Sequence, residues 1–347
     1  MGPAITVRSR AWPALLCAAV AVLVAVAQPA RAGRYASIVV NAETGRILQQ
    51  EHANARRYPA SLTKMMTLYM AFEALREGHL DLDTPLRVSR RAAGQPAMKL
   101  GLEYGETITV KNAILGMITK SANDAATVVA EALGGTEVAF ARMMTRKARE
   151  LGMINTTFRN ASGLPNRGQL STAADMATLG IALMRDFPRY YDYFDRRDFR
   201  FEGETHENHN QLLDKYKGTD GIKTGYIRAS GFNLVASVER EGHHLVGVVF
   251  GGRTPGSRDA HMTKLLDQGF RRLRTTEVVA LPRPRHHPRR GGPQGMAVAA
   301  RDGAPAAGAG MAPDGMVAMG DAALPESADD STDDGAGPPR PDAKPFL

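Results

Sequence analysis

Cysteine is almost absent from this chain of 347 residues, and the only one, Cys17, lies in the N-terminal segment. That segment also has two early arginines, an apolar run over residues 11–27 and the tripeptide Ala-Arg-Ala at 30–32. Together these features are typical of a secretory signal peptide and its cleavage site. Removal of residues 1–32 leaves no cysteine, so disulfide bonds are excluded and stability must come from core burial.

The apolar run of residues 11–27 is only slightly too short to cross a membrane, so a retained N-terminal anchor is the alternative to cleavage. Cleavage is the favoured interpretation and predicts a periplasmic or secreted protein. The chain also lacks a recognisable nucleic-acid-binding motif. Its formal charge of +8 falls to +5 when the three arginines of residues 1–32 are removed. We therefore expect no nucleic-acid partner.

Large apolar residues are scarce, and hydrophobic periodicity is lacking, from residue 277 onward. Residues 277–347 are rich in Pro, Gly, Ala and Asp, with basic residues at the start and acidic residues at the end. This composition predicts a disordered tail. It cannot form the apolar face of an amphipathic helix, so no C-terminal membrane anchor is evident. Residues 33–276 remain as one large domain.

Strand patterns gather at both ends of this domain. Residues 35–40 and 46–48 predict a hairpin, and further strands are expected at 221–225, 232–238 and 244–250. Helical patterns fill the middle, at 62–75, 110–118, 125–133, 137–151 and 172–184, and a last one covers 258–273. The order predicts an α+β fold, in which both ends of the domain build one sheet and a mainly helical lobe is inserted.

Ser61 and Lys64 stand three residues apart where the first helix is expected to begin. On a helix this spacing places both side chains on one face, where they can touch. Ser61 could cap that helix, which is the ordinary role of a serine at such a position. A serine nucleophile with a lysine base is the alternative, and it requires burial or a second cation to lower the pKa of the lysine.

Two further short motifs contain residue types that suit a catalytic cleft. Ser121 and Asn123 lie between two expected helices, where they could relay a proton and hold a substrate amide, or could simply cap a helix. Lys223, Thr224 and Gly225 lie in an expected strand. There the lysine could be the second cation, and the glycine permits the close approach of another backbone, such as a peptide added to the sheet edge.

Ser-x-x-Lys, Ser-x-Asn and Lys-Thr-Gly, in this order, resemble the motif set of the penicillin-interacting serine enzymes. The phrases around them, and Gly-Gly-Arg-Thr at 251–254, are similar to those of low-molecular-mass D-alanyl-D-alanine carboxypeptidases over residues 35–270. The resemblance implies a β-lactamase/transpeptidase-like fold, with residues 33–276 as the penicillin-binding D,D-peptidase domain and without a metal or cofactor.

The resemblance also implies roles for individual residues. Ser61 would be the nucleophile and Lys64 its base, while Ser121 and Asn123 would pair with that lysine and with the substrate amide. Lys223, Thr224 and Gly225 would line the opposite wall of the cleft. The backbone N–H groups of Ser61 and Tyr226 would form the oxyanion hole, and Arg253 would bind the terminal carboxylate of the substrate.

Three departures from the family pattern limit this transfer. Tyr226 stands where some members have histidine, so its side chain receives no role. Membrane-attached relatives continue into a second β-rich domain and an amphipathic helix, where this chain has its Pro- and Gly-rich tail. The loop at 159–166 has no carboxylate that could activate water against an acyl-enzyme, so β-lactams are expected to be slowly released covalent inhibitors.

The sequence thus predicts a serine D-Ala-D-Ala carboxypeptidase that removes the terminal D-alanine from peptidoglycan stem pentapeptides through an acyl-enzyme on Ser61. A D,D-endopeptidase that cleaves peptidoglycan cross-links uses the same acylation and is the nearest alternative. A non-catalytic cell-wall binding protein on the same scaffold is the alternative from another class. The sequence leaves open the oligomeric state and the partners of the tail.

Overall fold

A computed structural model describes Gly2, residues 34–274 and residues 279–280 of the chain, all within one unit, Met1–His287. The predicted signal peptide lies outside the described residues except for Gly2, and so does the predicted tail except for Val279–Ala280. No helix in the described part of the chain is both long enough and apolar enough to span a membrane.

Six strands form the main sheet, in the order β10-β2-β1-β9-β8-β7. Every neighbouring pair is antiparallel, and the pairing of β1 with β9 joins the N-terminal hairpin to the C-terminal strands. The strands are β1 (Ala36–Asn41), β2 (Arg46–Glu51), β7 (Thr219–Ile227), β8 (Gly231–Arg240), β9 (His243–Gly252) and β10 (Val279–Ala280). The prediction of one sheet built from both ends of the domain is confirmed, and β7 is an edge strand.

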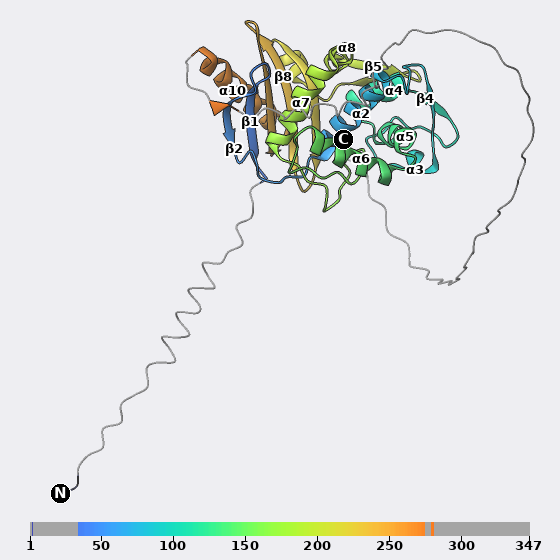
Figure 1. The fold of residues 1–347 in the computed structure, drawn as a ribbon, viewed down its shortest axis with the longest axis horizontal. Helices are drawn as coiled ribbons and strands as arrows, with labels where there is room; N and C mark the ends of the chain where they lie inside the picture. Colours follow the sequence, from blue (N-terminus) through green and yellow to red (C-terminus); the bar gives the residue numbers. More distant parts are fainter. Residues whose placement is uncertain (1, 3–33, 275–278, 281–347) are drawn as a thin grey trace, which may run out of the picture. The chain divides into compact units, whose positions relative to one another are not determined.

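The strand β1 is buried along its whole length because helices cover both faces of the sheet. Ile38 and Val40 contribute to one hydrophobic cluster and Val39 to the other, as the two-residue period of a strand requires. The helix α10 (Pro255–Arg274) packs on the Val39 face, where Gly247 leaves room for Met262. Figure 1 shows α10 and α7 on opposite sides of the strands.

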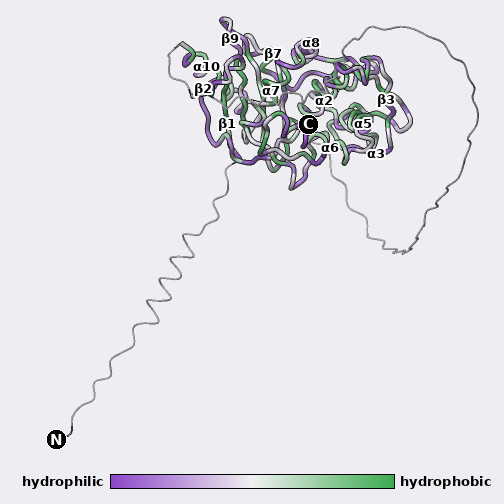
Figure 2. Tube along the Cα trace, in the orientation of Figure 1, coloured by the Kyte–Doolittle hydropathy of each residue, from purple (hydrophilic) through white to green (hydrophobic). Residues whose placement is uncertain are grey.

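Within the described residues, six helices form most of the inserted lobe, and three of them begin with a threonine cap. The lobe helices are α2 (Lys64–Arg76), α3 (Arg90–Ala93), α4 (Val110–Ile118), α5 (Asn123–Gly134), α6 (Glu137–Glu150) and α7 (Ala173–Asp186). Thr109, Thr136 and Thr172 each accept a hydrogen bond from a backbone N–H in the first turn of α4, α6 and α7. Figure 2 shows hydrophobic residues along α2, α5 and α7, the helices that form the interior of the lobe.

Several short elements were not predicted. They are the hairpin of β5 (Asp198–Phe201) with β6 (Glu204–Glu207), and the single turns α8 (Pro188–Tyr191), η2 (Asp192–Asp195) and α9 (Leu212–Lys215). The hairpin of β3 (Pro85–Arg87) with β4 (Thr107–Thr109) was indicated in part, because the sequence has short strand-like pieces at 88–89 and 108–110. Elements of three or four residues are too short for a periodic pattern to appear, and most of these lie between the last lobe helix and β7.

Phe72→Ala should lower the free energy of unfolding by about 3–5 kcal/mol, the usual loss for a buried phenylalanine. Phe72 is fully buried in α2, and its ring packs against those of Phe187, Tyr190 and Phe194. Urea unfolding would measure the loss. The matched control is Val138→Ala, which removes a side chain that is 57% exposed and should change the same free energy by less than about 0.5 kcal/mol. Equal effects of the two substitutions would contradict this description of the core.

Candidate active site

Ser61 lies in a short 3₁₀ helix, η1 (Ala60–Thr63), which runs directly into α2 at Lys64. The expectation that Ser61 caps α2 is wrong, because the N-cap residues of η1 and α2 are Pro59 and Thr63 and neither cap involves a side-chain hydrogen bond. A 3₁₀ turn places residues three apart directly in line. The Ser61 Oγ and the Lys64 Nζ accordingly lie 3.4 Å apart.

The amine of Lys64 is completely buried and is surrounded by neutral oxygen atoms. Its Nζ donates to the Oδ1 of Asn123 at 2.8 Å and to the backbone carbonyl of Ser162 at 2.6 Å. The Nδ2 of Asn123 donates to the carbonyl of Pro96, which fixes the orientation of the amide. A neutral amine has two hydrogens and one lone pair. Donation to Asn123 and Ser162 uses both hydrogens, which leaves the lone pair for the hydroxyl of Ser61.

Burial is the main cause that holds the pKa of Lys64 well below its usual value, and the charge of Lys223 lowers it further. Asp124 and Glu137 act in the opposite direction. No carboxylate contacts the amine within the described residues, so its charged form lacks the partner that a buried cation needs. The neutral form, which can accept a proton from a serine hydroxyl, is therefore favoured.

Ser121 lies between α4 and α5 in a left-handed backbone conformation, with φ of 60°. Its Oγ is buried and has no hydrogen-bond partner among the described residues. The expected pairing with Lys64 is thus made by Asn123 and not by Ser121. A strained residue with an unsatisfied hydroxyl is destabilising for the fold alone, and such residues gather at functional sites.

Lys223 and Thr224 are buried in β7, and Lys223 as a whole residue is 1% exposed. Among the described residues, its Nζ donates to the backbone carbonyl of Thr224 alone, at 3.3 Å. Burial, and then the charge of Arg258, lower the pKa of Lys223 to about 7. Arg258 is itself buried and paired with Asp259. Lys223 is thus a second amine without a carboxylate at contact distance in the described part of the chain, as the sequence predicts for the neighbour of Lys64.

Gly225 is required because the Ser61 turn packs directly on β7. A Cβ at this position would lie 3.0 Å from the backbone nitrogen of Ser61 and 3.1 Å from that of Leu62. The backbone that the glycine admits is therefore the chain's own, which the sequence analysis did not foresee. Asn233 fixes the same contact from the neighbouring strand β8, because its Nδ2 donates to the carbonyls of Tyr58 and Pro59.

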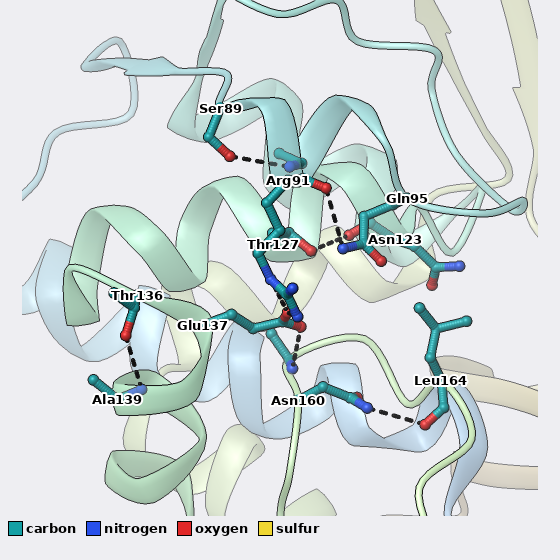
Figure 3. A network of polar contacts seen from close by, with 12 residues as sticks. Ser89, Arg91, Gln95, Asn123, Thr127, Thr136, Glu137, Ala139, Asn160 and Leu164 are labelled. Carbon is teal, nitrogen blue, oxygen red and sulfur yellow. Dashed lines mark hydrogen bonds and ion pairs between the residues drawn. The ribbon is translucent and has the colours of Figure 1, made fainter. Parts of the chain in front are cut away.

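The loop at 159–166 also packs against the Ser61 turn. Gly163 has φ of 92°, and a Cβ there would lie 2.0 Å from the carbonyl oxygen of Ala60. The loop is anchored by Glu137, which is 2% exposed, accepts from the backbone N–H of Ala161 and pairs with Arg91. Asn160 adds a bond to the carbonyl of Leu164. Figure 3 shows these contacts beside Asn123.

Sequence analysis missed four polar residues at this site: Ser162, Asn233, Arg258 and His209. His209 precedes Asn210, which bonds to the carbonyl of Gly221 in β7. Burial, followed by the charges of Lys223 and Lys120, lowers the pKa of His209 to about 4, so this ring belongs to the same positively charged region. Each is a single polar residue in an otherwise ordinary segment. The only available signal was their position near the recognised motifs.

Tyr226 and Arg253 lie at the outer end of the sheet, where both line a pocket of about 360 Å³. The structure therefore divides the predicted residues into two groups. Ser61, Lys64 and Asn123 form a hydrogen-bonded cluster beside β7, whereas Tyr226 and Arg253 are exposed at the strand ends. In the described part of the chain, no three His, Cys, Asp or Glu residues are grouped as a metal site would require.

Between about pH 7 and pH 10, the free energy of unfolding should rise less steeply in the Lys223→Met variant than in the wild type. The pKa of Lys223 is lowered from 10.5 to about 7 in the fold, so the unfolded chain binds more protons at this position throughout that window. Stability then rises with pH, by on the order of 4 kcal/mol at about 1.4 kcal/mol per pKa unit. Urea unfolding at several pH values would measure the slope. Lys111→Met, at an exposed position of α4, is the control, and equal slopes in the two variants would contradict the assignment.

Comparisons with a family profile and with individual known proteins point to the same family. The profile of the D-alanyl-D-alanine carboxypeptidases, peptidase family S11, matches residues 24–254. The chain is 38% identical over 249 residues to the D-alanyl-D-alanine carboxypeptidase DacA of Escherichia coli, with 70% of this chain and 62% of that protein covered. It is 35% identical over 248 residues to DacF of Bacillus subtilis, with 69% and 62% covered. The chain thus spans 62% of the length of these two curated relatives.

Solved structures agree with the sequence relatives. Penicillin-binding protein 5 of Haemophilus influenzae superposes with a TM-score of 0.66 at 34% identity, covering 68% of this chain and 70% of that one. Penicillin-binding protein D2 of Listeria monocytogenes, solved with cefotaxime bound, gives a TM-score of 0.63 at 30% identity, with 70% and 100% covered. These neighbours confirm the predicted β-lactamase/transpeptidase-like α+β fold. The chain belongs to the S11 family of D-alanyl-D-alanine carboxypeptidases.

Proposed function

We propose that this protein is a serine D-Ala-D-Ala carboxypeptidase that removes the terminal D-alanine from peptidoglycan stem pentapeptides. The observation that carries the proposal is the position of the Lys64 amine. This amine is buried, which favours its neutral form, and it lies 3.4 Å from the hydroxyl of Ser61. The names of the relatives agree with this activity. Action in the periplasm or outside the cell follows from the predicted signal peptide.

In the acylation step the Ser61 Oγ attacks the carbonyl carbon of the penultimate D-alanine, and the hydroxyl proton passes to the Lys64 Nζ. The backbone N–H groups of Ser61 and Tyr226 would stabilise the oxyanion, each worth about 3–4 kcal/mol if they act as in other serine enzymes. When the C–N bond breaks, the leaving amine of the terminal D-alanine takes up the proton from Lys64. Ser121, whose buried hydroxyl has no hydrogen-bond partner among the described residues, would relay it.

In the deacylation step a water molecule attacks the acyl carbonyl and gives its proton to the neutral Lys64. The ester bond breaks, and the Ser61 oxygen recovers a proton from the same amine. Both steps need Lys64 uncharged when it accepts a proton, which is why burial and the charge of Lys223 matter. Their combined effect is to let an amine act as a base nearer to neutral pH.

The substrate would lie along β7, the edge strand, with Asn123 and Thr224 in contact with its amide groups. Lys223 and Arg253 are the cations available for its terminal carboxylate. A carboxylate at contact distance would raise the pKa of Lys223 from about 7 and so return this amine to its charged form. Substrate binding and protonation of Lys223 are then coupled.

We further propose that β-lactams acylate Ser61 and are released slowly. Relatives have been solved with cefotaxime and with ampicillin bound. In this chain the backbone carbonyl of Ser162, and not a carboxylate, faces Lys64 from the loop at 159–166. Water activation in the acyl-enzyme thus depends on Lys64 alone.

Of the two alternatives, the non-catalytic binding protein is disfavoured. A buried amine without an ionic partner and a strained serine with an unsatisfied hydroxyl both destabilise a fold that has no use for them. The D,D-endopeptidase uses the same acylation and differs in the group that leaves. It remains a second activity to measure in the same assay.

Ser61→Ala should reduce the release of D-alanine from diacetyl-L-Lys-D-Ala-D-Ala by about 10³-fold or more, the scale of losses when a serine enzyme is deprived of its nucleophile. Liberated D-alanine would be measured with the mature wild type and the variant, after equal unfolding midpoints show that both are folded. Release that survives the substitution would contradict the mechanism. Faster loss of purified cross-linked dimers than of pentapeptides by the wild type would move the endopeptidase to first place.

Gly225→Ala should slow the covalent labelling of Ser61 by a fluorescent penicillin by about 10²-fold, because displacement of a reacting group by about 1 Å has that effect. The added Cβ meets backbone atoms of η1, which cannot move aside as a side chain would. Gly256→Ala is the matched control, since a Cβ there meets nothing within 4 Å. Similar labelling rates for the two variants would show that the contact between η1 and β7 does not position the nucleophile.

A further inference from the structure

A pocket of about 360 Å³ opens at the ends of β7, β8 and β9, next to the residues assigned to the reaction. Its floor is made of glycine backbone. A Cβ on Gly251 would lie 2.5 Å from the carbonyl carbon of Arg34, and one on Gly231 would lie 2.8 Å from the carbonyl oxygen of Gly252. Because Gly231 and Gly251 have no side chains, the strand ends can pack closely on neighbouring backbone. The space above these glycines is left as a hollow.

Three arginines, Arg34, Arg228 and Arg253, line this hollow, and no acidic residue does. None of the three has a hydrogen bond or ion pair within residues 34–274. Some other arginines in the same range are paired, as in Arg185 with Asp186 and Arg240 with Asp267. Unpaired guanidinium groups that gather on one pocket repel one another, and an anionic ligand would remove that repulsion.

The pocket also contains an aromatic surface. The rings of Tyr226 and Phe232 are stacked, with centroids 4.3 Å apart, and Tyr226 is 52% exposed. An exposed aromatic pair of this kind suits the aliphatic part of a ligand whose charged groups reach the surrounding arginines. The hollow therefore fits a molecule that is larger than a simple anion.

The position of the pocket relates it to the departing part of the substrate. Tyr226 directly follows Gly225, on which the Ser61 turn rests, and Arg253 is the residue assigned to the carboxylate of the leaving D-alanine. One arginine suffices for one carboxylate, because its guanidinium binds both oxygens at once. Arg34 and Arg228 are then in excess for a leaving group with a single carboxylate.

We propose that this pocket is a leaving-group subsite for a residue or peptide that carries at least one carboxylate beyond the one held by Arg253. Arg34 and Arg228 bind the additional carboxylate, and the Tyr226–Phe232 pair contacts the carbon chain that joins the two. This inference rests on the proposed function, since it takes the direction of the leaving group from it. It adds to that function a preference for leaving groups that carry an extra acidic group.

Two peptides that differ only in one charge test the subsite: diacetyl-L-Lys-D-Ala-D-Glu and diacetyl-L-Lys-D-Ala-D-Gln. Both keep the α-carboxylate, and only the first adds a second one. Binding to the Ser61→Ala protein would be measured by NMR titration, so that cleavage does not interfere. We expect the Glu peptide to bind about 5–10-fold more tightly than the Gln peptide, the scale of two partly exposed arginine contacts.

Arg34→Gln combined with Arg228→Gln in the Ser61→Ala background should bring this ratio of dissociation constants close to one. The matched control is Arg142→Gln with Arg146→Gln on α6, two exposed arginines without an ion-pair partner in the described part of the chain. This control changes the net charge equally and should keep the ratio. Raising the salt concentration should lower the ratio in the parent protein, as expected for exposed charges.

The outcomes separate this inference from the proposed function. Equal binding of the two peptides to the Ser61→Ala protein overturns the subsite, and so does a preference that survives loss of Arg34 and Arg228. Neither result bears on D-alanine release by the wild type, which tests the function by itself. A Glu preference that disappears only in the Arg34/Arg228 variant supports the subsite, whatever the turnover of D-Ala-D-Ala substrates is.

Discussion

An amine buried without a carboxylate at contact distance is the constraint on which the rest of this site depends. Lys64 is completely buried, and its hydrogen bonds go to an amide oxygen, a backbone carbonyl and a hydroxyl. A carboxylate in that position would hold the amine in its charged form and so remove its basicity. Burial of the neutral form costs little, because its two hydrogens have acceptors, and it leaves one lone pair directed at Ser61.

The same neighbourhood explains why Lys223 has to be buried as well. An exposed cation would be screened by water and would hardly lower the pKa of Lys64.

Ser61, the proposed nucleophile, is held by packing of backbone against backbone at two places. Gly225 of β7 admits η1 at one of them, and Gly163 of the loop at 159–166 contacts the carbonyl of Ala60 at the other. Asn233 adds hydrogen bonds to the residues just before η1. Contacts of this kind have no rotamer freedom, so they fix the position of Ser61 more tightly than side-chain packing would. The strained φ value of Ala60 is then a consequence of a turn that is set by its surroundings and not by its own preference.

Local chemistry made much of this fold predictable. Turn residues between alternating strands gave the β1–β2 and β8–β9 hairpins, and threonine caps gave the starts of α4 and α7. The three short motifs led to Ser61, Lys64 and Lys223 because each lies in a regular element.

The Ser61 turn was predicted wrongly as a cap, since a 3₁₀ helix of four residues has no periodic signal of its own. Ser162, Asn233 and Arg258 could not be found, because only the folded chain brings them to their partners. These partners are Lys64 for the Ser162 carbonyl, Tyr58 and Pro59 for the Asn233 amide, and Lys223 for the charge of Arg258.

Strand β7 joins two kinds of chemistry that need opposite surroundings. Its residues from Gly221 to Gly225 are buried, where a low dielectric shifts the pKa of Lys223, whereas Tyr226 is exposed at the rim. Proton transfer benefits from that burial, since charges in water would be screened. Selection of a charged leaving group benefits from exposure, because the ligand must exchange with solvent and a buried cluster of arginines would be too unstable to form. Because one edge strand passes from buried to exposed over a single residue, the reactive group and the arginine-lined pocket can lie next to each other and still keep separate environments.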